Sequence, residues 1–271
     1  MHSAIIIPAR YASTRLPAKP LVAIKGQSLL QRVVALSRAA AEGLANTQIY
    51  VATDDHRIEA HCAELGVACL MTPVDLATGT DRVAYAAAGL ANKPDFILNM
   101  QGDAALTPPD FLRALLQAYV AAPCDVITPV TQLSFTELDS LRQNKLTTPF
   151  SGTTATFDSQ TGRAFWFSKS IIPALRQEKS LREQGGKSPV FRHIGLYGFS
   201  YEALQQFAKL PEGHYERLDG VEILRMIEHG YHIRCIPVDY QGRANMSGID
   251  SPEDVKRAEL LIEKHGELVT A

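Results

Sequence analysis

The stretch that decides the fold runs from residue 5 to residue 20 and reads Ile5-Ile6-Ile7-Pro8-Ala9-Arg10-Tyr11-Ala12-Ser13-Thr14-Arg15-Leu16-Pro17-Ala18-Lys19-Pro20. Its first three residues are β-branched and too few for a helix, so they predict a buried strand of a parallel sheet. Pro8 ends this strand because proline lacks the N–H that a sheet requires. The loop that follows begins at the carboxyl end of a strand, where open α/β sheets bind their ligands.

The loop carries three cations, Arg10, Arg15 and Lys19. Cations held this close repel one another, so an anion such as a triphosphate would stabilise them. Arginine suits bidentate contacts with phosphate, and lysine acts as a point charge. The alternative is that the three side chains form a solvated face of the loop.

Short apolar strands alternate with amphipathic helices in the first half of the chain. Strands are expected at 48–53, 67–71 and 96–100, and helices at 29–42, 56–65, 80–90 and 108–121. Repeated βα units predict a doubly wound, mostly parallel Rossmann-like sheet with right-handed crossovers. A nucleotide-binding class is then an analogy at the level of the fold.

From residue 125 the pattern changes to strands joined by longer polar segments. Strands are expected at 126–130, 153–157, 163–167, 194–199 and 233–238, an exposed excursion at 177–188, and helices at 201–209, 218–229 and 252–264. Ser251 is a good N-cap for the last helix, with Pro252 at its first position. We therefore expect a single domain over residues 1–271, containing a strand-rich subdomain at about 125–201 that could dimerise.

The composition is that of an ordinary soluble globular protein. The 271 residues include 46% hydrophobic and 21% charged residues, which is enough to bury a core without staples. A net charge of −2 argues against nucleic acid as a partner. No segment has the length of a membrane span or the pattern of a signal peptide. The cysteines lack paired metal-site spacing and are expected to be free thiols in the cytoplasm: Cys62, Cys69, Cys124 and Cys235.

Two aspartates follow glycines at places where a metal site is plausible. Asp103 comes directly after a predicted strand and Gly102, so its carboxylate should lie at the same sheet edge as the basic loop. Asp250 follows Gly248 in a short loop. Mg²⁺ prefers oxygen ligands and is often held by one or two carboxylates together with substrate phosphates. Taken alone, each aspartate is more often a turn or cap residue, and the metal site is inferred from the two aspartates together with the basic loop.

The chain resembles the 3-deoxy-manno-octulosonate cytidylyltransferases, also called CMP-Kdo synthetases. The resemblance is carried most specifically by the stretch from Pro8 to Leu21. Further matching segments follow in order along nearly the whole chain, at 51–55, 78–82, 99–103, 167–168, 192–198 and 248–254.

This resemblance implies an enzyme that transfers CMP from CTP to the anomeric hydroxyl of a 2-keto-3-deoxy sugar acid, Kdo or a close relative. Pyrophosphate would be released and Mg²⁺ would be the cofactor. The resemblance also implies a homodimer that acts in lipopolysaccharide biosynthesis.

The family's functional positions carry over to this chain residue by residue. The catalytic set would be Arg10, Arg15, Lys19, Asp103 and Asp250, of which Asp103 and Asp250 would hold the metal. The nucleotide would contact Pro8, Ala9, Arg10, Arg15, Lys19, Thr78, Gly79, Arg82 and Asp103. The acceptor would contact Gln101, Lys169, His193, Tyr197, Asp219 and Glu222. For His193 and Tyr197 a packed structural role is the alternative.

The departures from the family pattern fall on the acceptor side. Ala104-Ala105 stands where the family usually has Glu-Pro, Lys169 replaces an arginine, Ile223 replaces a glutamine, and Thr153-Thr154-Ala155-Thr156 replaces Val-Lys-Val-Val. Loss of a buried hydrogen-bonding group could cost a matching hydroxyl about 1 to 3 kcal/mol. We therefore expect CTP as the nucleotide and leave the acceptor open. The alternatives are a cytidylyltransferase for a non-sugar acceptor such as a phosphonate, and a non-catalytic nucleotide-binding relative.

Overall fold

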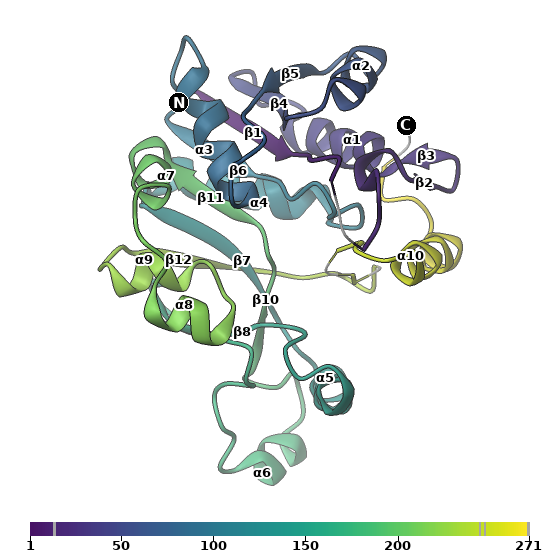
Figure 1. Ribbon diagram of the computed structural model, residues 1–271. Helices are drawn as coiled ribbons and strands as arrows, with labels where there is room; N and C mark the ends of the chain where they lie inside the picture. Colours follow the sequence, from purple (N-terminus) through teal and green to yellow (C-terminus); the bar gives the residue numbers. More distant parts are fainter. Residues whose placement is uncertain (13–14, 244, 247, 270–271) are drawn as a thin grey trace. The chain divides into compact units, whose positions relative to one another are not determined.

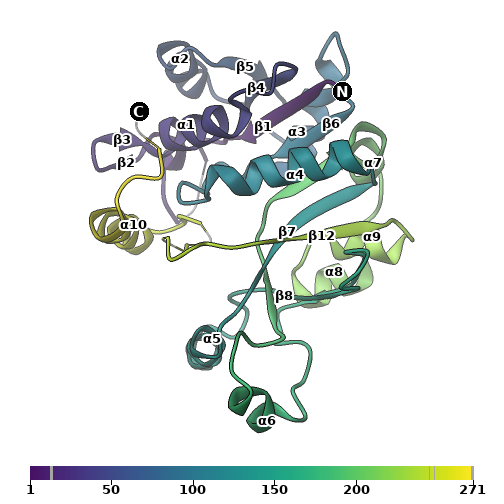
Figure 2. The same ribbon diagram turned by 180° about the vertical axis from the view of Figure 1, so that it is seen from behind.

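The computed structural model describes residues 1–12, 15–243, 245–246 and 248–269, so Ser13 and Thr14 of the basic loop lie outside the described residues. The described chain forms two compact units, whose elements Figures 1 and 2 show from two sides. The first unit takes in Met1–Pro123, Leu196–Ala208 and the described part of Tyr240–Ala271, and the second takes in Cys124–Gly195 and Lys209–Asp239. Whether the whole chain is a single domain stays a prediction.

The first unit is built on a mostly parallel sheet, as predicted. The strands follow the order β5-β4-β1-β6-β11, and only β11 runs antiparallel to its neighbour β6. Ile5 in β1 lies opposite Ile49 on one side and Leu98 on the other, and it is fully buried. The strands are β1 (Ser3–Pro8), β4 (Thr47–Thr53), β5 (Ala68–Met71), β6 (Phe96–Asn99) and β11 (Tyr197–Ser200).

Helices cover both faces of this sheet. Helices α1 and α4 pack against each other on one face, seen in Figure 2, while α3 and α7 pack on the other, seen in Figure 1. The helices are α1 (Leu29–Ala41), α2 (His56–Glu64), α3 (Gly79–Gly89), α4 (Pro109–Ala121), α7 (Tyr201–Phe207) and α10 (Pro252–His265). A 3-10 turn η1 (Lys19–Leu21) and a small hairpin of β2 (Ala23–Ile24) and β3 (Gln27–Ser28) follow the basic loop.

Local capping explains where the helices near the site begin. Thr78 caps α3 in a reciprocal capping box with Asp81, and Ser251 caps α10 in the same way with Asp254. Each box satisfies backbone N–H groups that the first helical turn leaves unpaired. The caps therefore fix the loops that precede α3 and α10.

The second unit contains a mixed sheet around β7 (Val126–Gln132). Strand β12 (Ile233–Val238) pairs with it in parallel and β10 (Phe191–His193) antiparallel, and the sheet continues antiparallel through β8 (Thr154–Phe157) to β9 (Ala164–Ser168). Its helices are α5 (Phe135–Thr147), α6 (Glu178–Glu183), α8 (His214–Asp219) and α9 (Leu224–Glu228).

The second half differs from the sequence predictions in several elements. The helix expected at 218–229 is two helices, α8 and α9, because Gly220 adopts the left-handed conformation with φ of 65° and ends α8. Helix α5 and the three-residue strand β10 were not predicted. The excursion expected at 177–188 carries the short helix α6, whose residues are half-buried or exposed.

Two expectations about the whole chain can be compared with the structure. The four cysteines are free thiols, as predicted, and Cys62 and Cys235 are buried. Among the described helices, none combines the length and apolar character that crossing a membrane would require.

Candidate active site

The site is assembled at the carboxyl ends of β1 and β6 in the first unit. Strand β1 ends at Pro8, and β6 leads into the segment from Gln101 to Asp103. A Cβ on Gly102 would lie 2.4 Å from the Pro8 carbonyl oxygen, closer than any real contact. Only glycine therefore lets the segment after β6 approach the end of β1 this closely and place Asp103 there.

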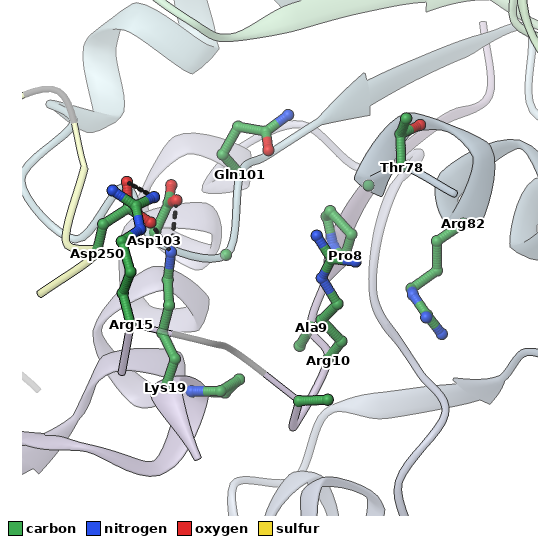
Figure 3. Close-up of a pocket in the computed structure, with 14 residues that line it drawn as sticks. Pro8, Ala9, Arg10, Arg15, Lys19, Thr78, Arg82, Gln101, Asp103 and Asp250 are labelled. Carbon is green, nitrogen blue, oxygen red and sulfur yellow. Dashed lines mark hydrogen bonds and ion pairs between the residues drawn. The ribbon is translucent and has the colours of Figure 1, made fainter. Parts of the chain in front are cut away.

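The predicted carboxylates meet at one ammonium group. Lys19 Nζ donates to Asp103 Oδ2 at 2.8 Å and to Asp250 Oδ1 at 2.7 Å. Arg15 Nη2 lies 3.2 Å from Asp250 Oδ2. Figure 3 shows these four side chains grouped together. The structure thus brings the basic loop and Asp103, which the sequence predicted at one sheet edge, together with Asp250 from a distant loop.

The loop before α10 is locked onto the segment after β6. The N–H of Ile249 donates to the Asp103 carbonyl at 3.1 Å. A Cβ on Gly248 would lie 3.4 Å from Asp103 Cγ, so a larger residue would crowd the carboxylate. The N–H of Asp250 donates to Asp254 Oδ2 at 3.0 Å, which ties the loop to the α10 cap. These contacts hold Asp250 beside Asp103.

The electrostatics of this group follow from partial burial and close charges. Withdrawal from water raises the pKa of Asp103, the attraction of Lys19 opposes this, and the charge on Asp250 adds to the rise. Burial also acts to raise the pKa of Asp250, but Lys19 and Arg15 outweigh it, so that pKa is lowered. Burial acts to lower the pKa of Lys19, but the two aspartates outweigh it and that pKa is raised. The protonation of Lys19, Asp103 and Asp250 therefore depends on the charges of their neighbours in the site.

The start of α3 forms another wall of the site. Thr78 and Gly79 lie at the helix N-terminus, and Arg82 lies one turn further on. A Cβ on Gly79 would lie 3.4 Å from Pro8 Cγ, which shows how closely α3 begins to the end of β1. In Figure 3, Thr78 and Arg82 lie on the opposite side of Pro8, Ala9 and Arg10 from the two aspartates.

Together these residues line a pocket of about 330 Å³, within the range of small-molecule sites. Every residue predicted to bind nucleotide or metal lines it, and so does Gln101, predicted for the acceptor. Ala12, Pro20 and Gly102 also line it and were not predicted. The sequence Pro-Ala-Lys-Pro was a signal for Pro20, and the position directly before Asp103 was a signal for Gly102. Nothing in the sequence distinguished Ala12. Arg10 donates no side-chain hydrogen bond to any described residue, which leaves its guanidinium available to a ligand.

The other residues predicted to contact the acceptor are distributed over the two units. Tyr197 belongs to β11 of the first unit, where it is buried opposite Asn99. Lys169, His193, Asp219 and Glu222 belong to the second unit. Their role as acceptor ligands stays a prediction.

His193 has the surroundings of a packed core residue. Its Nε2 lies 2.9 Å from Thr128 Oγ1, and its ring centroid lies 4.9 Å from that of Phe167. Burial lowers the pKa of His193 to about 3, and the charges on Lys169 and Arg192 act in the same direction. The imidazole is therefore neutral at physiological pH.

Lys169 and Asp219 lie together in the second unit. The backbone N–H of Lys169 donates to Asp219 Oδ1 at 2.6 Å, and both residues line a hollow of about 890 Å³ that also includes Lys145 and Trp166. Burial lowers the pKa of Lys169, while Asp219 opposes the shift. Lys145 is committed to structure, since its Nζ donates to the carbonyls of Lys169 at 2.6 Å and Gly152 at 2.9 Å.

Cations and paired carboxylates around a pocket at the carboxyl edge of a doubly wound sheet are typical of a nucleotidyltransferase. Comparison with known proteins agrees with this class, because residues 4–236 match the family described as cytidylyltransferase. The fold and the enzyme class predicted from the sequence are confirmed.

Three known proteins define the family more closely. The chain is 37% identical to a 3-deoxy-manno-octulosonate cytidylyltransferase of Maricaulis maris, over 97% of this chain and 98% of that relative. It is 35% identical to an 8-amino-3,8-dideoxy-manno-octulosonate cytidylyltransferase of a Shewanella species, over 96% and 98% of the two chains. A solved CMP:2-keto-3-deoxy-manno-octonic acid synthetase complexed with CTP matches the fold with a TM-score of 0.81 at 28% identity, covering 97% of this chain and 99% of the other. The chain belongs to the 3-deoxy-manno-octulosonate cytidylyltransferase family.

Proposed function

We propose that this enzyme transfers CMP from CTP to the anomeric hydroxyl of a 2-keto-3-deoxy sugar acid, either Kdo or a close relative such as its 8-amino form. The observation that carries the proposal is the first-unit pocket, in which Lys19 and Arg15 meet Asp103 and Asp250. Relatives that match nearly the whole chain are named as cytidylyltransferases of Kdo and of its 8-amino form, which supports the same assignment.

The pocket residues provide charge for a triphosphate without a covalent nucleophile. Arg10 and Arg15 have exposed guanidinium groups, and Lys19 provides a compact charge beside them. In the proposed reaction the acceptor hydroxyl gives its proton to water and its oxygen forms a bond to the α-phosphorus. The bond from that phosphorus to the oxygen that bridges to the β-phosphate breaks. The electron pair leaves with pyrophosphate, whose growing charge the three cations stabilise.

The donor set of the site fits Mg²⁺. Carboxylate oxygens of Asp103 and Asp250 lie 2.8 Å and 2.7 Å from Lys19 Nζ, so both carboxylates can coordinate a single cation. Among the described residues there is no cluster of three or more His, Cys, Asp or Glu side chains, so substrate oxygens and water would complete the coordination. Asp103 and Asp250 would hold the ion, which when bound lowers the pKa of the acceptor hydroxyl and neutralises phosphate charge.

Lys19 has two possible anionic partners in this proposal. Its ammonium now balances the two aspartates, and the raised pKa keeps it charged at physiological pH. A divalent cation between the aspartates would release Lys19 to contact the triphosphate. Binding of the nucleotide and of the cation should therefore favour each other.

The reaction is tested by incubating the protein with CTP, Mg²⁺ and a panel of acceptors, and measuring pyrophosphate. The panel contains Kdo, 8-amino-3,8-dideoxy-Kdo, other 2-keto-3-deoxy sugar acids and a phosphonate. We expect release with at least one sugar acid. Release with the phosphonate alone would refute the proposed acceptor class, and no release with any acceptor would refute the enzymatic proposal.

We further propose that the enzyme is a cytoplasmic homodimer that supplies an activated sugar for lipopolysaccharide biosynthesis. Free thiols on all four cysteines fit a reducing compartment. Large apolar side chains of the second unit lie exposed and could pair between two copies: Leu146, Phe150, Phe165 and Leu218. Sedimentation equilibrium should give a dimer mass, and a concentration-independent monomer would contradict this part of the proposal.

A further inference from the structure

A buried ion pair fixes Arg82 in the wall of the first-unit pocket. Arg82 Nη2 lies 3.1 Å from Asp54 Oδ2, with side chains only 3% and 9% exposed. Arg82 Nη1 donates to Thr72 Oγ1, whose hydroxyl donates in turn to the Thr53 carbonyl at 3.0 Å. Asp54 and Thr72 follow the ends of β4 and β5, so two neighbouring strands of the sheet hold one guanidinium.

The buried ion pair of Arg82 and Asp54 has a desolvation cost that a purely structural contact would not need. A buried ion pair gains little net stability because both groups lose their hydration. Asp54 Oδ1 is buried and has no hydrogen-bond partner among the described residues, which adds to the cost. Asp54 is also part of the matching segment 51–55, for which no role was predicted. A function for the orientation of Arg82 would explain why the pair is kept at a pocket wall.

The position of Arg82 relative to Lys19, Asp103 and Asp250 indicates which part of the bound nucleotide it would contact. In Figure 3, Lys19, Asp103 and Asp250 gather on one side of Pro8 to Arg10, and Arg82 lies on the other. All of these residues line the same pocket. If the triphosphate occupies the side with the aspartates, as the proposed function requires, the base extends toward the side of Arg82.

A guanidinium in this position can distinguish the two pyrimidines. Arginine only donates hydrogen bonds and stays charged. Cytosine presents adjacent acceptors at N3 and O2, whereas uracil carries a hydrogen on N3 and would direct a donor at the guanidinium. An arginine that could swing aside would lose this discrimination. One that is held from two strands keeps it.

We propose that Asp54, together with Thr72, fixes the Arg82 guanidinium against the N3 and O2 edge of cytosine, and so acts as the positioning residue that selects CTP over UTP. This inference rests on the proposed function for the use of CTP and for the direction of the bound nucleotide. It adds the residues that set the choice of base.

The test compares CTP and UTP in the wild type and in Asp54→Asn. Calorimetry without acceptor gives both dissociation constants, and turnover with the best acceptor gives KM and kcat. The wild type should prefer CTP by about 100-fold or more. Asp54→Asn should reduce that preference by about 10- to 100-fold, mainly through KM for CTP, because Arg82 loses its charged partner.

A matched control separates positioning from loss of stability. Glu216→Gln weakens the ion pair of Glu216 with Arg225 in the second unit, which is 2.8 Å long with side chains 8% and 10% exposed. It should lower stability and leave the ratio of CTP to UTP affinity unchanged. If Asp54→Asn does not fold, Thr72→Val removes the other partner of Arg82 and should shift the ratio in the same direction.

Three results would overturn the inference: equal binding of CTP and UTP by the wild type, equal weakening of both nucleotides in the variant, or the same change of ratio in Glu216→Gln. Calorimetry needs no acceptor, so it tests base selection even if no acceptor is turned over. Failure of the proposed reaction and failure of this inference are therefore distinguishable.

Discussion

Replacing Lys19 by methionine should destabilise the folded protein in a pH-dependent way. The substitution keeps an unbranched side chain but removes the ammonium that lies 2.8 Å from Asp103 and 2.7 Å from Asp250. The two carboxylates then face each other with Arg15 left as a counter-charge, 3.2 Å from Asp250 Oδ2. Because both touch the same nitrogen, their nearest oxygens lie at most about 5.5 Å apart, and repulsion at that distance is about 0.8 kcal/mol in water and about 3 kcal/mol at an effective dielectric constant of 20.

Partial exposure reduces these values. The side chains of Asp103 and Asp250 are 27% and 40% exposed, so solvent screens much of the interaction. Loss of two ion pairs at about 0.2 to 1 kcal/mol each, with the residual repulsion, gives a destabilisation of about 1 to 3 kcal/mol at pH 7.

The sign of the pH dependence follows from the shifted groups. The pKa of Lys19 is raised, so its contribution is fully present below its unfolded value near 10.5 and is lost only as pH rises through the folded pKa. The pKa of Asp250 is lowered, so its contribution is present above about 3.8 and is lost as pH falls through the folded pKa. Without Lys19 the carboxylates take up protons more readily. The deficit of the variant should therefore shrink on going from pH 7 to pH 4.

Urea unfolding of the wild type and Lys19→Met at both pH values measures this deficit. Lys25→Met is the matched control, because Lys25 pairs with Glu263 in the same unit at a more exposed position away from the pocket. The control should lose no more than about 0.5 kcal/mol. A deficit for Lys19→Met no larger than that of the control, or one that persists undiminished at pH 4, would refute the reasoning.

Three further predictions concern the same pocket. Gly102→Ala should destabilise the protein by about 1 to 3 kcal/mol and weaken CTP binding, because the new Cβ would lie 2.4 Å from the Pro8 carbonyl oxygen. The control Gly89→Ala should have neither effect, because the space around its Cβ is open. Equal unfolding midpoints for the two variants would contradict this prediction. Asp103→Asn should keep the folded state within about 1 kcal/mol of the wild type but reduce kcat by about 100-fold or more, and near-normal turnover would remove Asp103 from the proposed metal site. Chelation by EDTA should abolish pyrophosphate release, and added Mg²⁺ should restore it; turnover that survives chelation would show that no divalent cation is needed.

The parts of the site that could be predicted are those set by strand ends. The basic loop after Ile7 and the aspartate after Gly102 both follow buried apolar strands, and parallel strands bring their carboxyl ends to one edge. Asp250 could be joined to them only through its glycine and the resemblance. Its contact with Lys19 spans most of the chain, and no local pattern specifies such a distance.

The parts that could not be predicted depend on context beyond a few residues. Ser134 and Glu137 do form the capping box of α5, but the helix was missed because its apolar side chains are sparse and only Leu138 and Leu141 are buried. The contacts of Asp54 and Thr72 with Arg82 were also missed. Each looks like an ordinary turn residue in the sequence, and their significance comes from the shared contact with Arg82.

The most direct measurement is ³¹P NMR of the protein with CTP, Mg²⁺ and Kdo or its 8-amino form. The proposed reaction predicts that the CTP signals are replaced by pyrophosphate and by one phosphodiester signal of a CMP-linked sugar acid, in equal amounts. Unchanged CTP with every sugar acid, or hydrolysis to CMP and pyrophosphate without a phosphodiester, would contradict the assignment of the pocket to cytidylyl transfer.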